Sequence, residues 1–114
     1  EVGRKHGTPV ALGAATPTEA LRAHEAGADF VKVFPASQLG GPGFVKALKS
    51  VYPTVEIMPT GGINPPDIAP DIAAGAVCLG MGGKVVSDAA LKSGDVESSS
   101  DAERAVKAAV AALA

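Results

Sequence analysis

The 114-residue sequence is poor in the features that mark secreted, membrane-spanning or nucleic-acid-binding proteins. Its single cysteine, Cys78, excludes an internal disulfide and is typical of a reducing compartment. No apolar run approaches the ~20 residues that a transmembrane helix needs, and no signal peptide is visible. A formal net charge of −2 and a sequence pI ≈ 5.6 argue against nucleic acid as the main partner.

Aromatic residues are also scarce, at 4%, whereas the chain holds 14 glycines and 9 prolines. This combination indicates many tight turns where the backbone approaches another group closely. The hydrophobic content of 46% suits one globular unit, so residues 1–114 are predicted to belong to a single domain.

The segment 29–36, Asp-Phe-Val-Lys-Val-Phe-Pro-Ala, organises the chain, and its β-branched and aromatic residues predict a short strand. Side chains alternate along a strand, so Phe30, Lys32 and Phe34 share one face and the two valines share the other. Both faces are apolar, which is typical of a parallel sheet buried on both sides. Burial disfavours a charged lysine and leaves a neutral amine, which attacks carbonyls. Lys32 is therefore a candidate nucleophile, and the alternative is a lysine near the strand end that reaches to water.

The rest of the chain alternates apolar runs with helix signals. The predicted elements in chain order are a strand at 8–14, a helix capped by Thr16 and Glu19, the strand at 29–36, a loop at 37–43, a helix from Phe44 to Val51, a strand at 55–60, a helix beginning at 64–67 and ended by Gly75, a strand at 76–81, a helical turn at 87–91, a polar connection at 92–99 and a last helix capped by Ser100 and Glu103.

Strand and helix alternate four times, which predicts an α/β protein with a parallel sheet. Two architectures fit this order. One is a (β/α)8 TIM barrel of which the chain supplies about four βα units, and the other is a small open doubly wound sheet. A full barrel needs ~200–250 residues, so the barrel interpretation makes this chain about half of one.

Glycine pairs follow the last two predicted strands, at the carboxyl ends where both architectures bind ligands. They are Gly61-Gly62 and Gly82-Gly83. Exposed backbone N–H groups form a cradle for anions, so these turns predict a phosphorylated ligand, with ordinary tight βα turns as the alternative. The turn after Lys84 is a candidate for the short extra helix that often borders a barrel phosphate site.

Thr60 ends the third predicted strand and shares a face with Glu56. If Lys32 faces a barrel interior, the Thr60 hydroxyl is available to a carboxylate or a keto oxygen, and otherwise it bonds its own turn. A Schiff-base lysine also needs a proton-transfer partner. Glu56 precedes Thr60 by four residues, ~13 Å along a strand, which puts it at the wrong end. The chemistry that Lys32 implies is therefore incomplete in this chain.

Several short blocks stand in the order and spacing of one known family. They are Ala15–Glu19, Val31–Ala36, Pro59–Ile63 and Gly80–Gly83, followed by the tail Asp88–Asp95. Together they resemble the C-terminal half of the 2-keto-3-deoxy-6-phosphogluconate (KDPG) aldolase family, some members of which cleave 4-hydroxy-2-oxoglutarate. The resemblance implies a (β/α)8 barrel, usually trimeric, of which this chain carries about the last four βα units.

The resemblance also implies roles for individual residues. Lys32 corresponds to the lysine that forms a Schiff base with pyruvate, Phe34 to the aromatic ring beside it and Thr60 to a threonine of the pyruvate pocket. The phosphate site corresponds to Gly61, Gly62, Gly82 and Gly83.

The sequence departs from the family at two positions and lacks other functional groups of the family. Relatives often carry Pro where Leu12 stands, and many carry Ser where Gly83 stands, so a hydroxyl to phosphate is missing. Lys84 is nearby as a compensating point charge. The family's glutamate base and the groups that hold the substrate carboxylate belong to the first half of the barrel.

The activity implied by the resemblance is class I aldol cleavage of 2-dehydro-3-deoxy-6-phosphogluconate to pyruvate and glyceraldehyde 3-phosphate. No metal or organic cofactor is expected, because the iminium polarises the substrate. The alternatives are 4-hydroxy-2-oxoglutarate cleavage and a non-catalytic phosphate-binding half-barrel that pairs with itself through its open edges. Small keto acids and a homo-oligomer are the expected partners, rather than nucleic acid or membrane. We expect a cytoplasmic location, with a plastid as the alternative if a targeting segment precedes Glu1.

Overall fold

The structure, a computed structural model, describes residues 1–83, 85–86, 88–94 and 96–113. The elements in chain order are α1 (Val2–Lys5), β1 (Ala11–Ala14), α2 (Pro17–Glu25), β2 (Phe30–Val33), α3 (Ala36–Leu39), α4 (Pro42–Val51), β3 (Ile57–Pro59), the 3-10 helix η1 (Pro65–Asp67), α5 (Ile68–Ala73), α6 (Asp88–Ser93) and α7 (Val96–Ala111).

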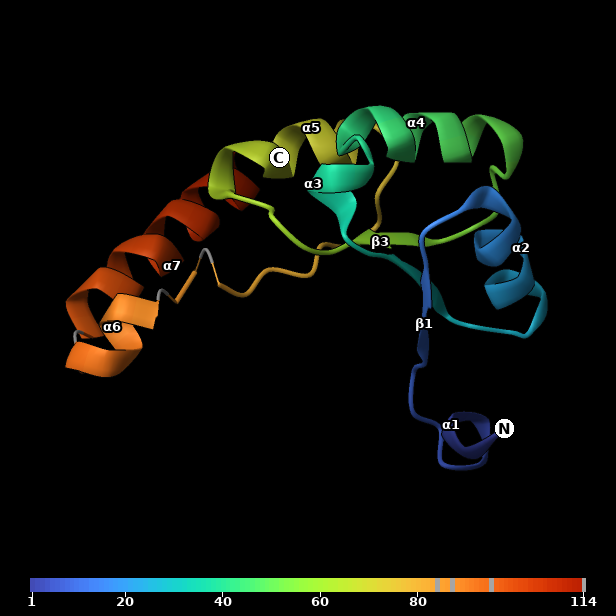
Figure 1. The fold of residues 1–114 in the computed structure, drawn as a ribbon, viewed down its shortest axis with the longest axis horizontal. Helices are drawn as coiled ribbons and strands as arrows, with labels where there is room; N and C mark the ends of the chain where they lie inside the picture. Colours follow the sequence, from blue (N-terminus) through green and yellow to red (C-terminus); the bar gives the residue numbers. More distant parts are fainter. Residues whose placement is uncertain (84, 87, 95, 114) are drawn as a thin grey trace.

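The three strands form one parallel sheet in the order β1-β2-β3 (Figure 1). This confirms the predicted α/β class with parallel strands in sequence order. The fourth predicted strand, 76–81, is only partly realised. It is joined to the β3 segment by two isolated parallel bridges, Ile57 to Ala76 and Thr60 to Gly80. The bridged residues are three positions apart in the β3 segment and four positions apart in the 76–81 segment. The second segment therefore has one extra residue between the bridges, which interrupts regular strand pairing.

The start of α2 follows its sequence signal closely. The Thr16 hydroxyl accepts from the Glu19 backbone N–H at 3.3 Å, and the Glu19 carboxylate accepts from the Thr16 N–H at 3.0 Å and the Ala15 N–H at 2.8 Å. These bonds complete the predicted capping box. The Ala15 N–H, followed by the Thr16 hydroxyl and N–H, lowers the pKa of Glu19.

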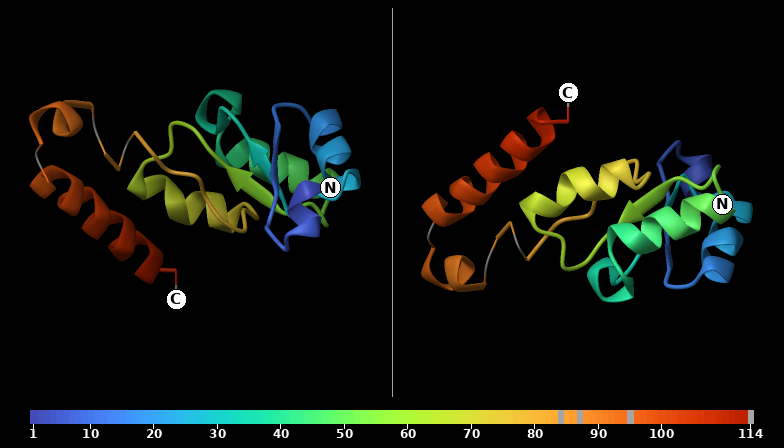
Figure 2. Two further views of the ribbon diagram at one scale, coloured as in Figure 1. Left: turned by 90° about the horizontal axis from the view of Figure 1, so that it is seen from below. Right: turned by 90° about the horizontal axis from the view of Figure 1, so that it is seen from above.

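The core lies on one face of the sheet. The buried strand residues Val31, Val33 and Ile57 pack in one cluster with residues of α2 and α4. Figure 1 shows α4 and α5 along one side of β3, and Figure 2 shows the α6–α7 pair set apart from the strands, with α7 beside α5.

The opposite face of the sheet is uncovered in this chain. Lys32 is half-buried there and Phe34 is 54% exposed. The prediction of burial on both faces of the 29–36 strand is therefore wrong for the chain by itself, because no described element packs over the Lys32 side. The alternation of the two faces is confirmed, since Val31 and Val33 are each 1% exposed.

Three further local predictions differ from the structure. The predicted loop at 37–43 contains the short helix α3, which ends at Gly40 with φ 119°. The predicted polar connection at 92–99 is wrong at Lys92 and Ser93, which belong to α6, and again from Val96 onward, where α7 begins and places Ser100 inside the helix instead of at its cap. The short N-terminal helix α1 was not predicted.

The chain is more extended than a complete small domain. Its radius of gyration is 15.3 Å, whereas a compact domain of ~100 residues has ~13 Å. It exposes 6884 Å², whereas a compact monomer of this mass exposes ~5,700 Å². The excess surface agrees with a sheet that has an uncovered face. No helix among the described residues is long and apolar enough to cross a bilayer.

Asp71 in α5 is the buried charged residue of the described core, at 2% exposure. Its Oδ1 atom has no hydrogen-bond partner among the described residues. Burial, followed by the nearby Asp67 carboxylate, raises the pKa of Asp71 from its ordinary value of 3.8. The folded chain therefore binds more protons at this site than the unfolded chain, and its stability falls as the pH rises from 3.8 through the raised value.

Asp71→Asn is expected to remove this pH dependence. At neutral pH the variant should exceed the wild type in unfolding free energy by an amount on the order of 1 kcal/mol, because a charged carboxylate is no longer buried without a partner. The gain should vanish below pH 3.8, where both states of the wild type are protonated. Thermal unfolding across this range measures the effect. Glu25→Gln, at an exposed carboxylate of α2, is the charge-matched control, and an equal gain there would contradict the explanation.

Candidate active site

Lys32 lies in the middle of the sheet on its uncovered face. Its neighbours in register are Gly13 on β1 and Met58 on β3. Gly13 has no side chain, and a Cβ added there would meet no atom within 4 Å. The space beside Lys32 is therefore open on the β1 side, so the amine is accessible to a small molecule approaching this face.

The Lys32 side chain lies over the ring of Phe34, two residues further along the strand. The distance from Nζ to the ring centroid is 5.5 Å. A cation over a ring face at this distance is attracted by ~0.5–1 kcal/mol at an exposed site. Phe34 therefore helps to hold the amine on the uncovered face.

The glycine turns after β3 and after the 76–81 segment converge on one hollow, which we call the glycine hollow. Its volume is about 370 Å³. The lining residues are Thr60, Gly61, Gly62, Ile63, Gly80, Gly82 and Gly83. The structure thus brings together Thr60 and the four glycines that the sequence singled out.

Two of these glycines have backbone conformations that other residues rarely adopt. Gly61 has φ 98° and Gly62 has φ 74°. A Cβ on Gly61 would lie 3.0 Å from the Phe34 ring, and one on Gly62 would overlap the Ser37 hydroxyl. Both positions therefore require glycine, and the turn is pressed against the segment that follows Lys32.

Backbone hydrogen bonds join the β3 turn to the start of α3. The Ala36 N–H donates to the Thr60 carbonyl at 2.8 Å, and the Ser37 N–H donates to the Gly61 carbonyl at 3.2 Å. The Thr60 hydroxyl has only a long contact of 3.5 Å to the Met58 carbonyl. Both predicted roles of this hydroxyl therefore stay predictions.

Lys32 is not among the residues that line the glycine hollow. The expectation that Lys32 and Thr60 face one cavity is therefore not met by this chain. Lys32 lies in β2, Thr60 directly follows β3, and the Phe34 ring lies close to the turn at Gly61. An uncovered sheet face supplies no wall that would join the two regions. Lys84 falls outside the described residues, and none of the described residues of α6 lines the hollow.

Glu56 precedes β3 and is exposed. Its position at the amino end of the strand confirms that it is remote from the turn at Thr60.

Gly80 is a residue of the hollow whose packing the sequence analysis did not predict. Its N–H donates to the Pro59 carbonyl at 2.8 Å, and an added Cβ would overlap the Thr60 hydroxyl and lie 2.9 Å from Thr60 Cγ2. A glycine that closes an apolar run, opposite a strand end, is the signal of such a close approach.

Gly80→Ala is expected to displace Thr60 and loosen the bridge between the two segments. We expect a loss of ~1–3 kcal/mol in unfolding free energy, the usual cost of overpacking. Urea unfolding measures it. Gly43→Ala on α4 is the control, because a Cβ there meets nothing within 4 Å and alanine favours the helix. Equal behaviour of the two variants would contradict the close packing of Gly80 on Thr60.

Solved structures similar to this chain include a KDPG aldolase. A structure described as native KDPGal has a TM-score of 0.81 and 35% identity, over 94% of this chain and 50% of the other. KDPG aldolase from Legionella pneumophila, with pyruvate captured as a covalent carbinolamine intermediate, has a TM-score of 0.73 and 30% identity, over 92% of this chain and 50% of the other. The fold and the site at the carboxyl ends of its strands place the chain in the class of α/β proteins with the TIM-barrel-like aldolase fold.

Sequence comparison specifies the family. The family described as KDPG and KHG aldolase matches residues 1–101, and the chain belongs to it. The 2-dehydro-3-deoxy-6-phosphogalactonate aldolase of Escherichia coli is 44% identical over 78 residues, which are 68% of this chain and 38% of that protein. The 2-dehydro-3-deoxy-phosphogluconate aldolase of Treponema pallidum is 39% identical over 90 residues, 79% of this chain and 43% of that protein. The chain spans about half the length of such relatives or less.

Proposed function

We propose that this chain is the Schiff-base and phosphate-binding part of a class I aldolase that cleaves 2-dehydro-3-deoxy-6-phosphogluconate to pyruvate and glyceraldehyde 3-phosphate. The observation that carries the proposal is Lys32, an accessible amine on the uncovered face of a parallel strand, in a chain of the KDPG and KHG aldolase family. The pyruvate adduct described for the Legionella pneumophila aldolase supports covalent chemistry of this kind.

The proposal includes a (β/α)8 barrel of which this chain forms about four βα units. Its support is the parallel order of the strands and the placement of the core helices on one face, whereas a doubly wound sheet has helices on both. The uncovered face corresponds to the lumen in this interpretation. Lys32 and Phe34, from the β2 segment, and Thr60, which follows β3, are then residues of the lumen.

In the proposed reaction, Lys32 Nζ attacks the C2 ketone, and loss of water from the carbinolamine leaves an iminium. The C3–C4 bond then breaks, its electron pair moves toward the iminium, and the C4 hydroxyl loses a proton to a base as the aldehyde leaves. The resulting enamine takes a proton at C3, and water releases pyruvate. The base belongs to the part of the relatives that this chain does not span.

The glycine hollow is the proposed site of the 6-phosphate. Its volume of about 370 Å³ accommodates a phosphate, and its turns expose backbone N–H groups as anion donors. Cleavage of 4-hydroxy-2-oxoglutarate is the second candidate activity. One observation favours it: the described lining has no charged side chain, so the phosphate must be held by the backbone and the Thr60 hydroxyl.

Borohydride trapping tests the proposed nucleophile. Incubation with pyruvate and borohydride should add a reduced pyruvyl group to the peptide that contains Lys32, detected by mass spectrometry. Comparison of kcat/KM for substrates with and without the 6-phosphate, on the chain completed by its missing part, separates the two activities. A preference for the unphosphorylated substrate would favour 4-hydroxy-2-oxoglutarate.

Assembly and location are further parts of the proposal. We propose a cytoplasmic homotrimer of completed barrels, whereas a non-catalytic half-barrel would pair with itself through its uncovered face and open edges. Light scattering on the chain by itself discriminates between these cases. A stable self-paired dimer that captures no pyruvate would favour the non-catalytic alternative.

A further inference from the structure

A second hollow lies beside the glycine hollow, and we call it the carboxylate hollow. Its volume is about 330 Å³. It lies where α3, the turn into α4, and the η1–α5 segment meet. It shares only Gly62 and Ile63 with the glycine hollow. The lining residues are Ala36, Ser37, Gly40, Gly41, Pro42, Gly62, Ile63, Asp67 and Asp71.

The charged groups in this described lining are two carboxylates, Asp67 and Asp71, four residues apart and thus on one side of the η1–α5 segment. Asp67 Oδ2 accepts from the Asn64 backbone N–H at 2.8 Å and from the Asn64 side-chain amide at 3.1 Å. Asp71 is 2% exposed, and its Oδ1 atom is sealed without a hydrogen-bond partner among the described residues. The hollow therefore presents negative charge, and one carboxylate oxygen buried in its wall has no donor among the described residues.

Three hydrogen-bond donors around the hollow are already engaged. The Gly41 N–H donates to the Ala36 carbonyl at 2.9 Å, and the Gly40 N–H donates to the Ser37 carbonyl at 3.4 Å. The Ser37 hydroxyl donates to Gln38 Oε1 at 2.8 Å. A buried acceptor without a donor is unfavourable, and these neighbours cannot supply one without losing a bond. A positively charged ligand with its own N–H donors would complement the two carboxylates.

We propose that the carboxylate hollow binds a small organic cation through a guanidinium or primary ammonium group held by Asp71 and Asp67. Such groups form short charge-assisted hydrogen bonds to carboxylates. The volume of about 330 Å³ is at the lower end of the range for small-molecule sites, and it accommodates ~10 heavy atoms at ~30 Å³ each. A bare divalent cation fits less well, because the described residues contain no group of three or more His, Cys, Asp or Glu side chains that could hold one.

The two hollows share one wall. Gly62 and Ile63 line both hollows, on the turn whose N–H groups are the proposed phosphate cradle. This binding does not depend on the proposed aldolase activity, and the test below needs no turnover.

Agmatine is the probe, because it has a guanidinium at one end and a primary ammonium at the other. Isothermal titration at neutral pH and constant ionic strength should show saturable binding to the wild-type chain. n-Butylurea, which has a similar shape and no charge, should not bind. Asp71→Asn should weaken agmatine binding at least ~10-fold, as expected for loss of a charge-assisted bond. Glu25→Gln removes an equal charge from exposed α2 and should leave the affinity unchanged.

Amide chemical shifts locate the ligand without a variant. Agmatine should perturb the amides of Ser37, Gly41, Gly62 and Asp71 in the wild type, and spare those of α2. Absence of saturable binding, or equal affinity in the wild type and Asp71→Asn, would overturn the proposal. Binding of Mg²⁺ but not agmatine would replace the organic cation with a metal. Concentration-dependent association that Asp71→Asn abolishes would instead assign the hollow to a basic side chain of a second copy, and would also overturn it.

Discussion

Lys32→Met is expected to reduce borohydride-dependent labelling by pyruvate to the level seen without pyruvate. The methionine side chain retains most of the length and apolar stem of lysine, so the fold should persist while the nucleophile is lost. Lys32 is half-buried on the uncovered face beside Gly13 and Phe34, outside the core cluster, so the fold should be insensitive to this change. Peptide mapping of the labelled chain, with circular dichroism as the check on folding, measures both effects. In the completed enzyme the same change should remove detectable cleavage.

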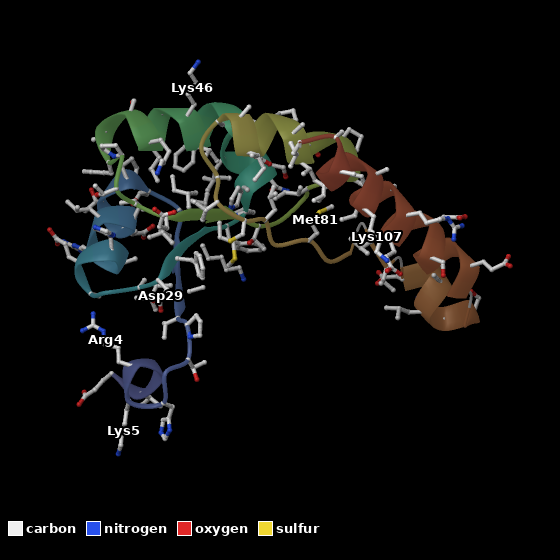
Figure 3. The ribbon with its side chains drawn as sticks, turned by 180° about the vertical axis from the view of Figure 1, so that it is seen from behind. Arg4, Lys5, Asp29, Lys46, Met81 and Lys107 are labelled. Carbon is white, nitrogen blue, oxygen red and sulfur yellow. The ribbon has the colours of Figure 1, made fainter. Side chains whose placement is uncertain are left out.

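Lys46→Met is the matched control for this prediction. Lys46 is exposed on α4, and Figure 3 shows its side chain directed away from the sheet and into solvent. It should label no more than other surface lysines, and its loss should leave the Lys32 adduct unchanged. Labelling that follows Lys46 or Lys84 instead of Lys32 would show that another lysine is the nucleophile.

Local signals in the sequence were sufficient where a few neighbouring residues decide the structure. The capping box of Thr16 and Glu19 is formed by groups three residues apart, so its bonds depend on little else. The same holds for Gly75, which ends α5 with φ 108°. The convergence of the glycine turns also followed from topology, because the carboxyl ends of parallel strands meet at one edge.

Predictions that depended on distant partners were less accurate. The apolar pattern around Lys32 indicates burial on both faces, but burial requires a second layer, and the described chain supplies only one. Similarly, the apolar run at 76–81 has the composition of a strand, but it pairs with only two residues of its neighbour. The uneven spacing between these bridges is a three-dimensional property that alternation of residue types does not encode.

Asp71 shows a third limit of sequence patterns. In the sequence it is a charged residue of a short helix next to two prolines, and such a residue is normally exposed. In the structure it is buried near Asp67, in the wall of the carboxylate hollow that faces the α3–α4 turn. Only the packing of segments more than twenty residues apart shows that the carboxylate lacks a partner.

The largest expected effect comes from restoring the missing part of the barrel. The chain by itself should cleave little or no 2-dehydro-3-deoxy-6-phosphogluconate, because the described residues offer Lys32 no proton-transfer partner and its sheet face is open to water. A general acid–base group contributes ~10²–10⁴-fold to a rate, so adding a folded first half from a relative should raise turnover by about that factor.

Covering the uncovered face is the second reason for this increase. The added half would exclude water from the Lys32 region, which strengthens every electrostatic interaction there and favours the neutral amine that attacks a ketone. Pyruvate release in a coupled assay should therefore appear only when both halves are present, together with a mixed complex in size-exclusion chromatography. A mixture containing the Lys32→Met chain should form the same complex and remain inactive. Robust cleavage by the isolated chain would show that a base exists within it, and activity of the Lys32→Met mixture would show that the added half supplies the nucleophile.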